Sequence, residues 1–115
     1  QSASDPDIQD IYYKIEYEEF IYGEAFHQSG DEVKLDKLLE LYENMAKLYK
    51  LNNITIEDLD YVAYSYLVVY QDDNVQDYLD YLDEWYEERG MKLKPYSAFR
   101  EVGRILEQKY FEDEE

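Results

Sequence analysis

Hydrophobic residues recur along this chain at intervals of three and four positions, which is the pattern of helices that bury one face. No segment alternates between apolar and polar residues with the period of a β-strand. The pattern therefore predicts an all-α fold of about five helices in antiparallel hairpins. We expect the helices over about residues 6–27, 30–51, 56–71, 75–89 and 95–110.

Residues suited to helix ends support these boundaries. Pro95 is placed to open the last helix, and Gly90 stands where a C′ glycine would end the fourth. Several polar side chains stand where an N-cap would accept hydrogen bonds from the first turn, three of them followed by an acidic residue at capping-box spacing. The expected N-caps are Asp5, Ser29, Thr55 and Asn74, and Glu32, Asp58 and Asp77 follow the last three.

An internal repeat connects the predicted helices. Gly23, Ala63 and Gly103 are separated by 40 residues each, and the helix openers Thr55 and Pro95 are separated by the same interval. Small residues at fixed positions allow two helix backbones to approach closely. A period of this length with helix-turn-helix content is typical of stacked hairpins, so we expect a short solenoid-like array.

One stretch resembles a known repeat architecture. The segment 74–106, with the Gly-Met-Lys-Leu-Lys-Pro link at 90–95, is similar to tetratricopeptide and pentatricopeptide repeats. The resemblance implies helical hairpins. The RNA binding of pentatricopeptide repeats is not expected here, because a chain with a net charge of −18 repels phosphate.

The third predicted helix is unusually apolar. From Tyr61 to Tyr70 it carries no charge, and apolar residues occupy all its faces. Such a helix is normally enclosed by its neighbours, so we expect it at the centre, with the second and fourth predicted helices beside it. The alternative is an exposed apolar face for a partner. Its residues would be Tyr61, Tyr64 and Val68.

Composition favours a folded protein. Hydrophobic residues make up 45% of the chain and fifteen residues are tyrosine, which argues against disorder despite the charge. We expect one helical domain over 6–111, a flexible start at 1–5 and an acidic tail at 112–115.

No apolar run is long enough to span a membrane, and the charge disfavours anionic lipid. We expect a cytoplasmic protein, with secretion or organellar import after N-terminal processing as the alternative.

The acidic residues are concentrated in one region. Between Ile56 and Glu88 there are eleven acidic residues and no lysine or arginine. Many of these carboxylates fall on one side of the fourth predicted helix, where repulsion between them costs stability. Such a row would suit a basic partner, or it would serve solubility alone. The candidate partner-binding residues are Asp73, Asp77, Asp80, Asp83, Glu84, Glu87 and Glu88.

The six basic residues of 89–109 are expected to neutralise the fourth predicted helix.

Catalytic motifs are scarce. His27 is the single histidine, and its Glu24-x-x-His27 spacing would need a second copy to build a di-iron site. With no cysteine either, we expect no metal, no cofactor and no enzymatic activity.

These observations favour a non-enzymatic protein that binds a basic protein partner, such as a nucleic-acid-binding protein. In length, charge and its acidic end at 112–115 the chain resembles DNA-mimic inhibitor proteins. That resemblance implies an inhibitor that occupies a nucleic-acid site. The alternative function is a helical-repeat adaptor or assembly subunit, which binds a peptide or helix through the apolar tyrosine-rich face.

Overall fold

The computed structural model describes residues 4–111, and these residues form helices and connecting segments without a strand. The all-α prediction is therefore confirmed for this part of the chain. The flexible start at 1–5 falls partly, and the acidic tail at 112–115 wholly, outside the described residues. The elements are α1 (Pro6–Glu16), the 3₁₀ turn η1 (Glu24–Phe26), α2 (Gly30–Lys50), α3 (Ile56–Leu59), the 3₁₀ turn η2 (Asp60–Val62), α4 (Ala63–Tyr70), α5 (Asp73–Glu88) and α6 (Ser97–Phe111).

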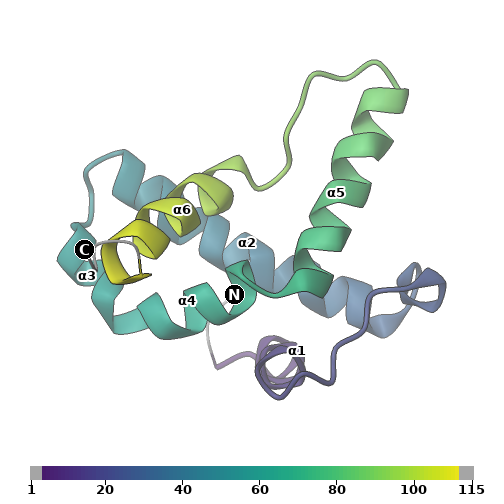
Figure 1. Ribbon diagram of the computed structural model, residues 1–115, viewed down its shortest axis with the longest axis horizontal. Coiled ribbons are helices and arrows are strands. Elements are labelled where there is room, and N and C mark those ends of the chain that lie inside the picture. The colour runs from purple at the N-terminus through teal and green to yellow at the C-terminus, as the bar shows by residue number, and fades with distance from the viewer. Residues whose placement is uncertain (1–3, 112–115) are drawn as a thin grey trace.

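The long helix α2 is the centre of the fold. It packs against α1 on one side and α6 on another, and α4 contacts both α1 and α6 (Figure 1). This arrangement differs from the expected one, in which the helix after Thr55 is central. The reason is that α2 presents a long row of buried leucines and Tyr42, whereas α4 is short and leaves one side exposed. Helix α5 rises away from the others, and the segment 89–96 returns from its far end to α6 (Figure 1).

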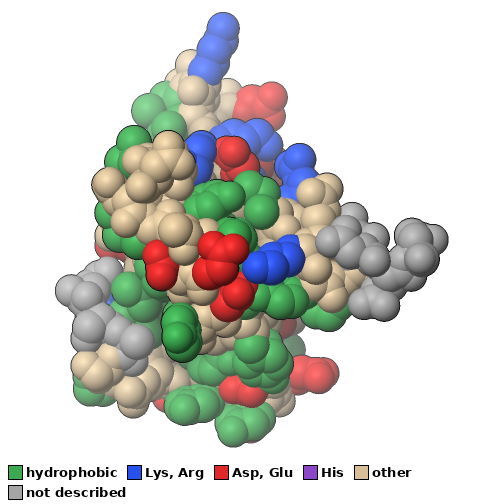
Figure 2. All heavy atoms as spheres, turned by 90° about the vertical axis from the view of Figure 1, so that its left-hand side faces the viewer, with side chains coloured by type: hydrophobic (Ala, Val, Ile, Leu, Met, Phe, Trp, Pro, Cys, Tyr) green, Lys and Arg blue, Asp and Glu red, His purple; other side chains and the backbone are tan. Residues whose placement is uncertain are grey.

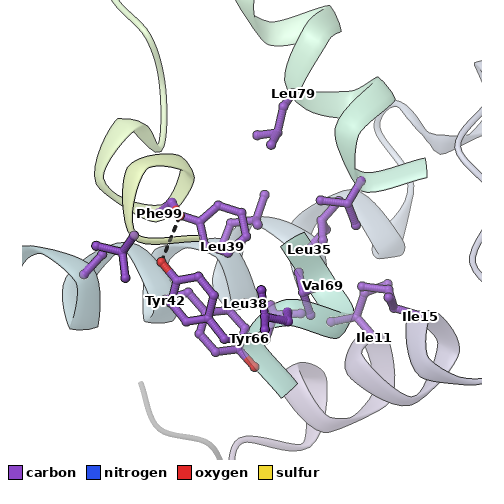
Figure 3. Packing of buried hydrophobic residues seen from close by; sticks show 14 of the residues in the cluster. Ile11, Ile15, Leu35, Leu38, Leu39, Tyr42, Tyr66, Val69, Leu79 and Phe99 are labelled. Atoms are coloured by element: carbon purple, nitrogen blue, oxygen red, sulfur yellow. Dashed lines mark hydrogen bonds between the residues drawn. The ribbon is translucent and has the colours of Figure 1, made fainter. Parts of the chain in front are cut away.

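The core is built from aliphatic residues and from tyrosines with paired hydroxyls. Tyr66 is fully buried and donates a hydrogen bond of 2.9 Å to the carbonyl oxygen of Phe99 (Figure 3). The Tyr42 hydroxyl donates to Ser65 Oγ at 3.0 Å. Because each ring is buried while its hydroxyl has an acceptor, tyrosine can replace leucine here without the cost of an unpaired polar group.

Local capping chemistry is largely as predicted. Ser29 accepts a hydrogen bond from the Glu32 backbone, and Thr55 forms a complete capping box with Asp58. The Glu32 carboxylate accepts from the Gln28 backbone at 2.6 Å instead of from Ser29. Gly90 follows α5 with φ at +74°, the left-handed conformation expected of a C′ glycine.

The first helix is shorter than predicted. It ends at Glu16, and the backbone N–H groups of Glu19 and Phe20 both return to the carbonyl of Lys14. The chain then turns so that Phe20 and Phe26 enter the core. Burial of these two rings outweighs the helical pattern of 17–27.

Three other boundaries also differ. The predicted helix 56–71 is interrupted by η2, where Asp60 accepts hydrogen bonds from Lys109 and Tyr110 of α6. Helix α5 is capped by Asp72, which accepts from the Val75 backbone at 2.9 Å, and not by Asn74. Helix α6 begins at Ser97, two residues after Pro95.

The 40-residue correspondence does not mark a structural repeat. Ala63 and Gly103 are buried, but Gly23 is exposed, lies outside every α-helix and has open space where a side chain would be. The solenoid-like array is therefore not shown. Gly103 has a local reason of its own, because a Cβ atom there would lie 2.7 Å from Cγ of Tyr70.

Candidate functional site

The acidic candidate residues lie on α5, a helix with two unlike faces. Val75, Tyr78 and Leu79 anchor its first half in the core, and the second half extends away from the body (Figure 1). At about 100° per residue, the acidic row falls within an arc of about 80° on the opposite face. Its exposed members are Asp73, Asp77, Asp80, Glu84 and Glu87, and the exposed Glu88 flanks them.

These carboxylates are not neutralised by the protein itself. Within residues 4–111, none of the six forms a salt bridge. The lysines of the other helices pair elsewhere, such as Lys34 with Asp10 and Lys50 with Glu101. The basic segment 89–109 neutralises α5 only in part, because Lys94 and Arg100 both pair with Asp83, whereas Lys109 pairs with Asp60 and Arg89 stacks on the Trp85 ring at 3.8 Å.

Asp83 differs from its neighbours and is a correction to the predicted row. Its carboxylate accepts two hydrogen bonds from Arg100, at 2.8 and 3.0 Å, and one from Lys94 at 3.4 Å. Burial alone would raise the pKa of Asp83, but the bonds and charges of Arg100 and Lys94 outweigh it, so the pKa is lowered. Asp83 therefore joins α5 to α6 and is not free for a partner.

The three residues of the alternative apolar site differ in exposure. Tyr61 is 93% exposed and Tyr64 is 68% exposed, whereas Val68 is half-buried one turn further along α4. The Tyr64 hydroxyl donates to Glu16 at 3.0 Å. Hydrophobic side chains also lie exposed among charged groups at the end of the molecule formed by α3 and the last turns of α6 (Figure 2).

A half-buried carboxylate, which no sequence pattern singles out, connects three parts of the fold. Asp36 of α2 accepts hydrogen bonds from Tyr78 at 2.8 Å and from Tyr96 at 3.2 Å. Burial raises the pKa of Asp36 above its ordinary value, although the two hydroxyls act in the opposite direction. Because Tyr78 lies on α5 and Tyr96 precedes α6, this carboxylate positions the base of the acidic helix.

His27 lies in an aromatic cluster beside α5. Its Nε2 is 2.7 Å from the Tyr22 hydroxyl, its Nδ1 is 3.6 Å from Glu32 Oε2, and its ring is 4.3 Å from that of Tyr81. The order carboxylate, imidazole, hydroxyl is that of an activated nucleophile. However, the Glu32 distance exceeds a hydrogen bond, and burial raises the pKa of Tyr22, so the hydroxyl keeps its proton. The cluster anchors the segment 17–29 on α5.

Metal-holding groups and membrane-spanning helices are not found in the described part of the chain. No group of three or more His, Asp or Glu side chains in residues 4–111 is arranged to hold a metal ion. None of the helices there is long and apolar enough to cross a membrane. Comparison with protein-family models, with curated proteins and with solved structures finds no match to this chain.

Proposed function

We propose that this protein is a non-enzymatic binder of a basic protein, which it recognises through the acidic face of α5. The observation that carries the proposal is the row of five exposed carboxylates with no salt bridge in the described residues. Such a row costs stability through repulsion between neighbours about one turn apart, and a cationic partner relieves that repulsion. The row also steers a basic partner toward α5, since uncompensated charge raises association rates.

A nucleic-acid-binding protein is the partner class that this face suits best. From Asp73 to Glu87 the row spans about 21 Å at about 1.5 Å per residue, or about one carboxylate every 5 Å. One strand of DNA carries a phosphate about every 3.4 Å along its axis. The row is thus somewhat less dense than one strand, and Glu88 raises the density at its far end.

The test is capture of partners from the source cell, at low and high salt, with wild type and two charge-matched variants. The row variant carries Asp77→Asn, Asp80→Asn and Glu84→Gln. The control carries three exposed changes outside α5, namely Glu24→Gln, Glu40→Gln and Glu57→Gln. We expect a Lys/Arg-rich protein to be captured by wild type and control, released by DNA and lost from the row variant. Capture of that same protein by the row variant at low salt would contradict the proposal.

The adaptor function is a second candidate because Tyr61 and Tyr64, three residues apart, are both exposed, and neighbouring exposed rings form the kind of patch that a partner can cover. An adaptor of this kind would bind a peptide or helix through Tyr61, Tyr64 and Val68. Its partner would be lost on Tyr61→Ala and retained by the row variant. The acidic binder and the adaptor therefore predict opposite results for the row variant and for Tyr61→Ala.

A further inference from the structure

A groove runs between α1 and the start of α5. Its walls are the end of α1, the segment 18–21, the last turn of α4 and the α4–α5 connection, which lie together in the fold (Figure 1). Its volume is about 510 Å³. It begins at the base of the acidic row, because Asp73 belongs both to the row and to the groove.

Two hydrogen bonds hold the walls in place. The Tyr64 hydroxyl of α4 donates to Glu16 of α1 at 3.0 Å, and the Tyr22 backbone donates to the Asn74 side chain of α5 at 2.8 Å. The bonds join segments that are 48 and 52 residues apart in the chain. The groove is therefore formed before a ligand arrives, which lowers the entropic cost of binding.

The groove is strongly negative. Four carboxylates line it, and no lysine or arginine does. The N-terminus of α5 contributes only about half a positive charge. Burial raises the pKa of Asp72, and the charges of Asp73 and Glu18 raise it further, as expected of carboxylates that lie close together without a cation. The four are Glu16, Glu18, Asp72 and Asp73.

The same groove has apolar walls. Ile15 and Phe20 are buried beneath it, Val68 is half-buried, and Ile21 is 70% exposed. Pure charge recognition does not need an exposed isoleucine between carboxylates. An aliphatic surface beside negative charge fits a side chain with an apolar stem and a cationic end, or an apolar residue next to lysine or arginine.

We propose that this groove binds an amphipathic, cationic segment of the protein partner, with aliphatic side chains on Ile21 and Val68 and lysine or arginine at Glu18 and Asp73. The inference rests on the proposed function only in taking the partner to be basic. It adds that the partner is recognised by apolar contact as well as by charge. The groove then fixes one end of the partner segment, and the acidic row of α5 extends from that end.

The experiment measures binding of a labelled amphipathic Leu/Lys peptide of about 14 residues, or four helical turns, by fluorescence anisotropy. An oligolysine of equal charge is the comparison. Ile21→Ser removes an apolar side chain from the groove and should leave the fold intact, because Ile21 is exposed. Glu18→Gln removes the charge of one carboxylate that lines the groove. The row variant of α5 is measured in parallel, and amide chemical shifts locate the bound peptide.

We expect wild type to prefer the Leu/Lys peptide to oligolysine by about tenfold or more, and Ile21→Ser to abolish most of that preference. Part of the binding should persist at about 0.5 M salt, where charge is screened. Shift changes should centre on residues 15–21 and 68–74.

Equal binding of the two peptides with no effect of Ile21→Ser would overturn the groove proposal, as would shift changes confined to the far half of α5. A wild-type dimer that Ile21→Ser dissociates would also overturn it, by assigning the groove to a second copy of this chain. These results are separate from the cellular capture experiment. If the row variant retains its cellular partner but Ile21→Ser loses the preference, the α5 proposal fails and the groove proposal stands.

Discussion

The carboxylate of Asp83 receives two hydrogen bonds from the guanidinium of Arg100, at 2.8 and 3.0 Å, and so ties the projecting half of α5 to α6. Both side chains are mostly shielded, with 24% and 19% of their surface exposed. The pair separates Asp83 from the acidic row beside it. Two carboxylates three residues apart on one helix, Asp80 and Asp83, thus have different roles.

The first prediction compares these two residues. Asp83→Asn should lower the free energy of unfolding by about 1 kcal/mol, because it weakens a bidentate ion pair that is partly screened by solvent. Asp80→Asn should leave stability unchanged or slightly raise it, because it relieves repulsion on the exposed face. Urea unfolding of both variants measures the difference. Equal effects from the two changes would contradict the separate roles.

The pH dependence of Asp83 follows from its lowered pKa. A carboxyl with a lower pKa in the folded state stabilises the protein above its unfolded value, which is 3.8, and the contribution is lost as the pH falls through the folded pKa. The stability gap between wild type and Asp83→Asn should therefore be full at neutral pH and begin to close below about pH 4.

The second prediction concerns Asp36, whose pKa is raised, whereas that of Asp83 is lowered. Its folded carboxyl holds a proton more tightly than the unfolded one, so ionisation at neutral pH costs stability. Asp36→Asn keeps an oxygen for both tyrosine hydroxyls and removes that cost. The variant should be as stable as wild type or more stable at pH 7, and the difference should shrink as the pH falls through the raised pKa toward 3.8.

Asp36→Leu provides the contrast. It leaves the hydroxyls of Tyr78 and Tyr96 without their acceptor, which should cost about 2–3 kcal/mol. Glu24→Gln, an exposed change outside α2, is the control and should have little effect. Thermal unfolding at two pH values measures all three. A loss of stability in Asp36→Asn as large as that in Asp36→Leu would show that the charge itself holds the tyrosines.

The parts of the fold that sequence patterns predict correctly depend on neighbouring residues. The capping box of Thr55 and Asp58 spans three positions, and Gly90 acts within one turn of α5. Each is visible in the sequence because the two interacting groups lie in the same short segment. The all-α class follows in the same way from the spacing of apolar residues.

The wrong predictions fall where distant residues decide the outcome. The end of α1 depends on burial of Phe20 and Phe26 against other elements. Asn74 does not cap a helix, because its side chain accepts from Tyr22, 52 positions away. Asp83 resembles its acidic neighbours in sequence, and its pairing with Arg100 and Lys94, 17 and 11 positions away, distinguishes it. The groove combines α1, α4 and α5, so no local pattern could have revealed it.

The third prediction concerns Glu18, which has φ at +59° just after α1. This left-handed conformation is costly for a residue with a side chain and is the usual place for glycine after a helix. Glu18→Gly should raise the free energy of unfolding by about 0.5–1 kcal/mol. Glu19→Gly should lower it, since Glu19 is not in that conformation. Urea unfolding measures both variants, and a Glu18→Gly protein no more stable than Glu19→Gly would contradict the assigned strain.

The last prediction concerns Gly103, on the buried side of α6. Gly103→Ala adds a Cβ atom 2.7 Å from Cγ of Tyr70, closer than carbon atoms normally approach, so the Tyr70 ring or the helix must shift. Overpacking of this kind costs about 1–3 kcal/mol, whereas alanine gains about 1 kcal/mol in helix propensity over glycine. We therefore expect a net loss of stability in thermal unfolding. Gly30→Ala is the matched control, since open space surrounds that position in the first turn of α2, and it should be neutral or stabilising. If Gly103→Ala melted at or above the temperature of Gly30→Ala, the close approach of α4 and α6 at this point would not limit the packing.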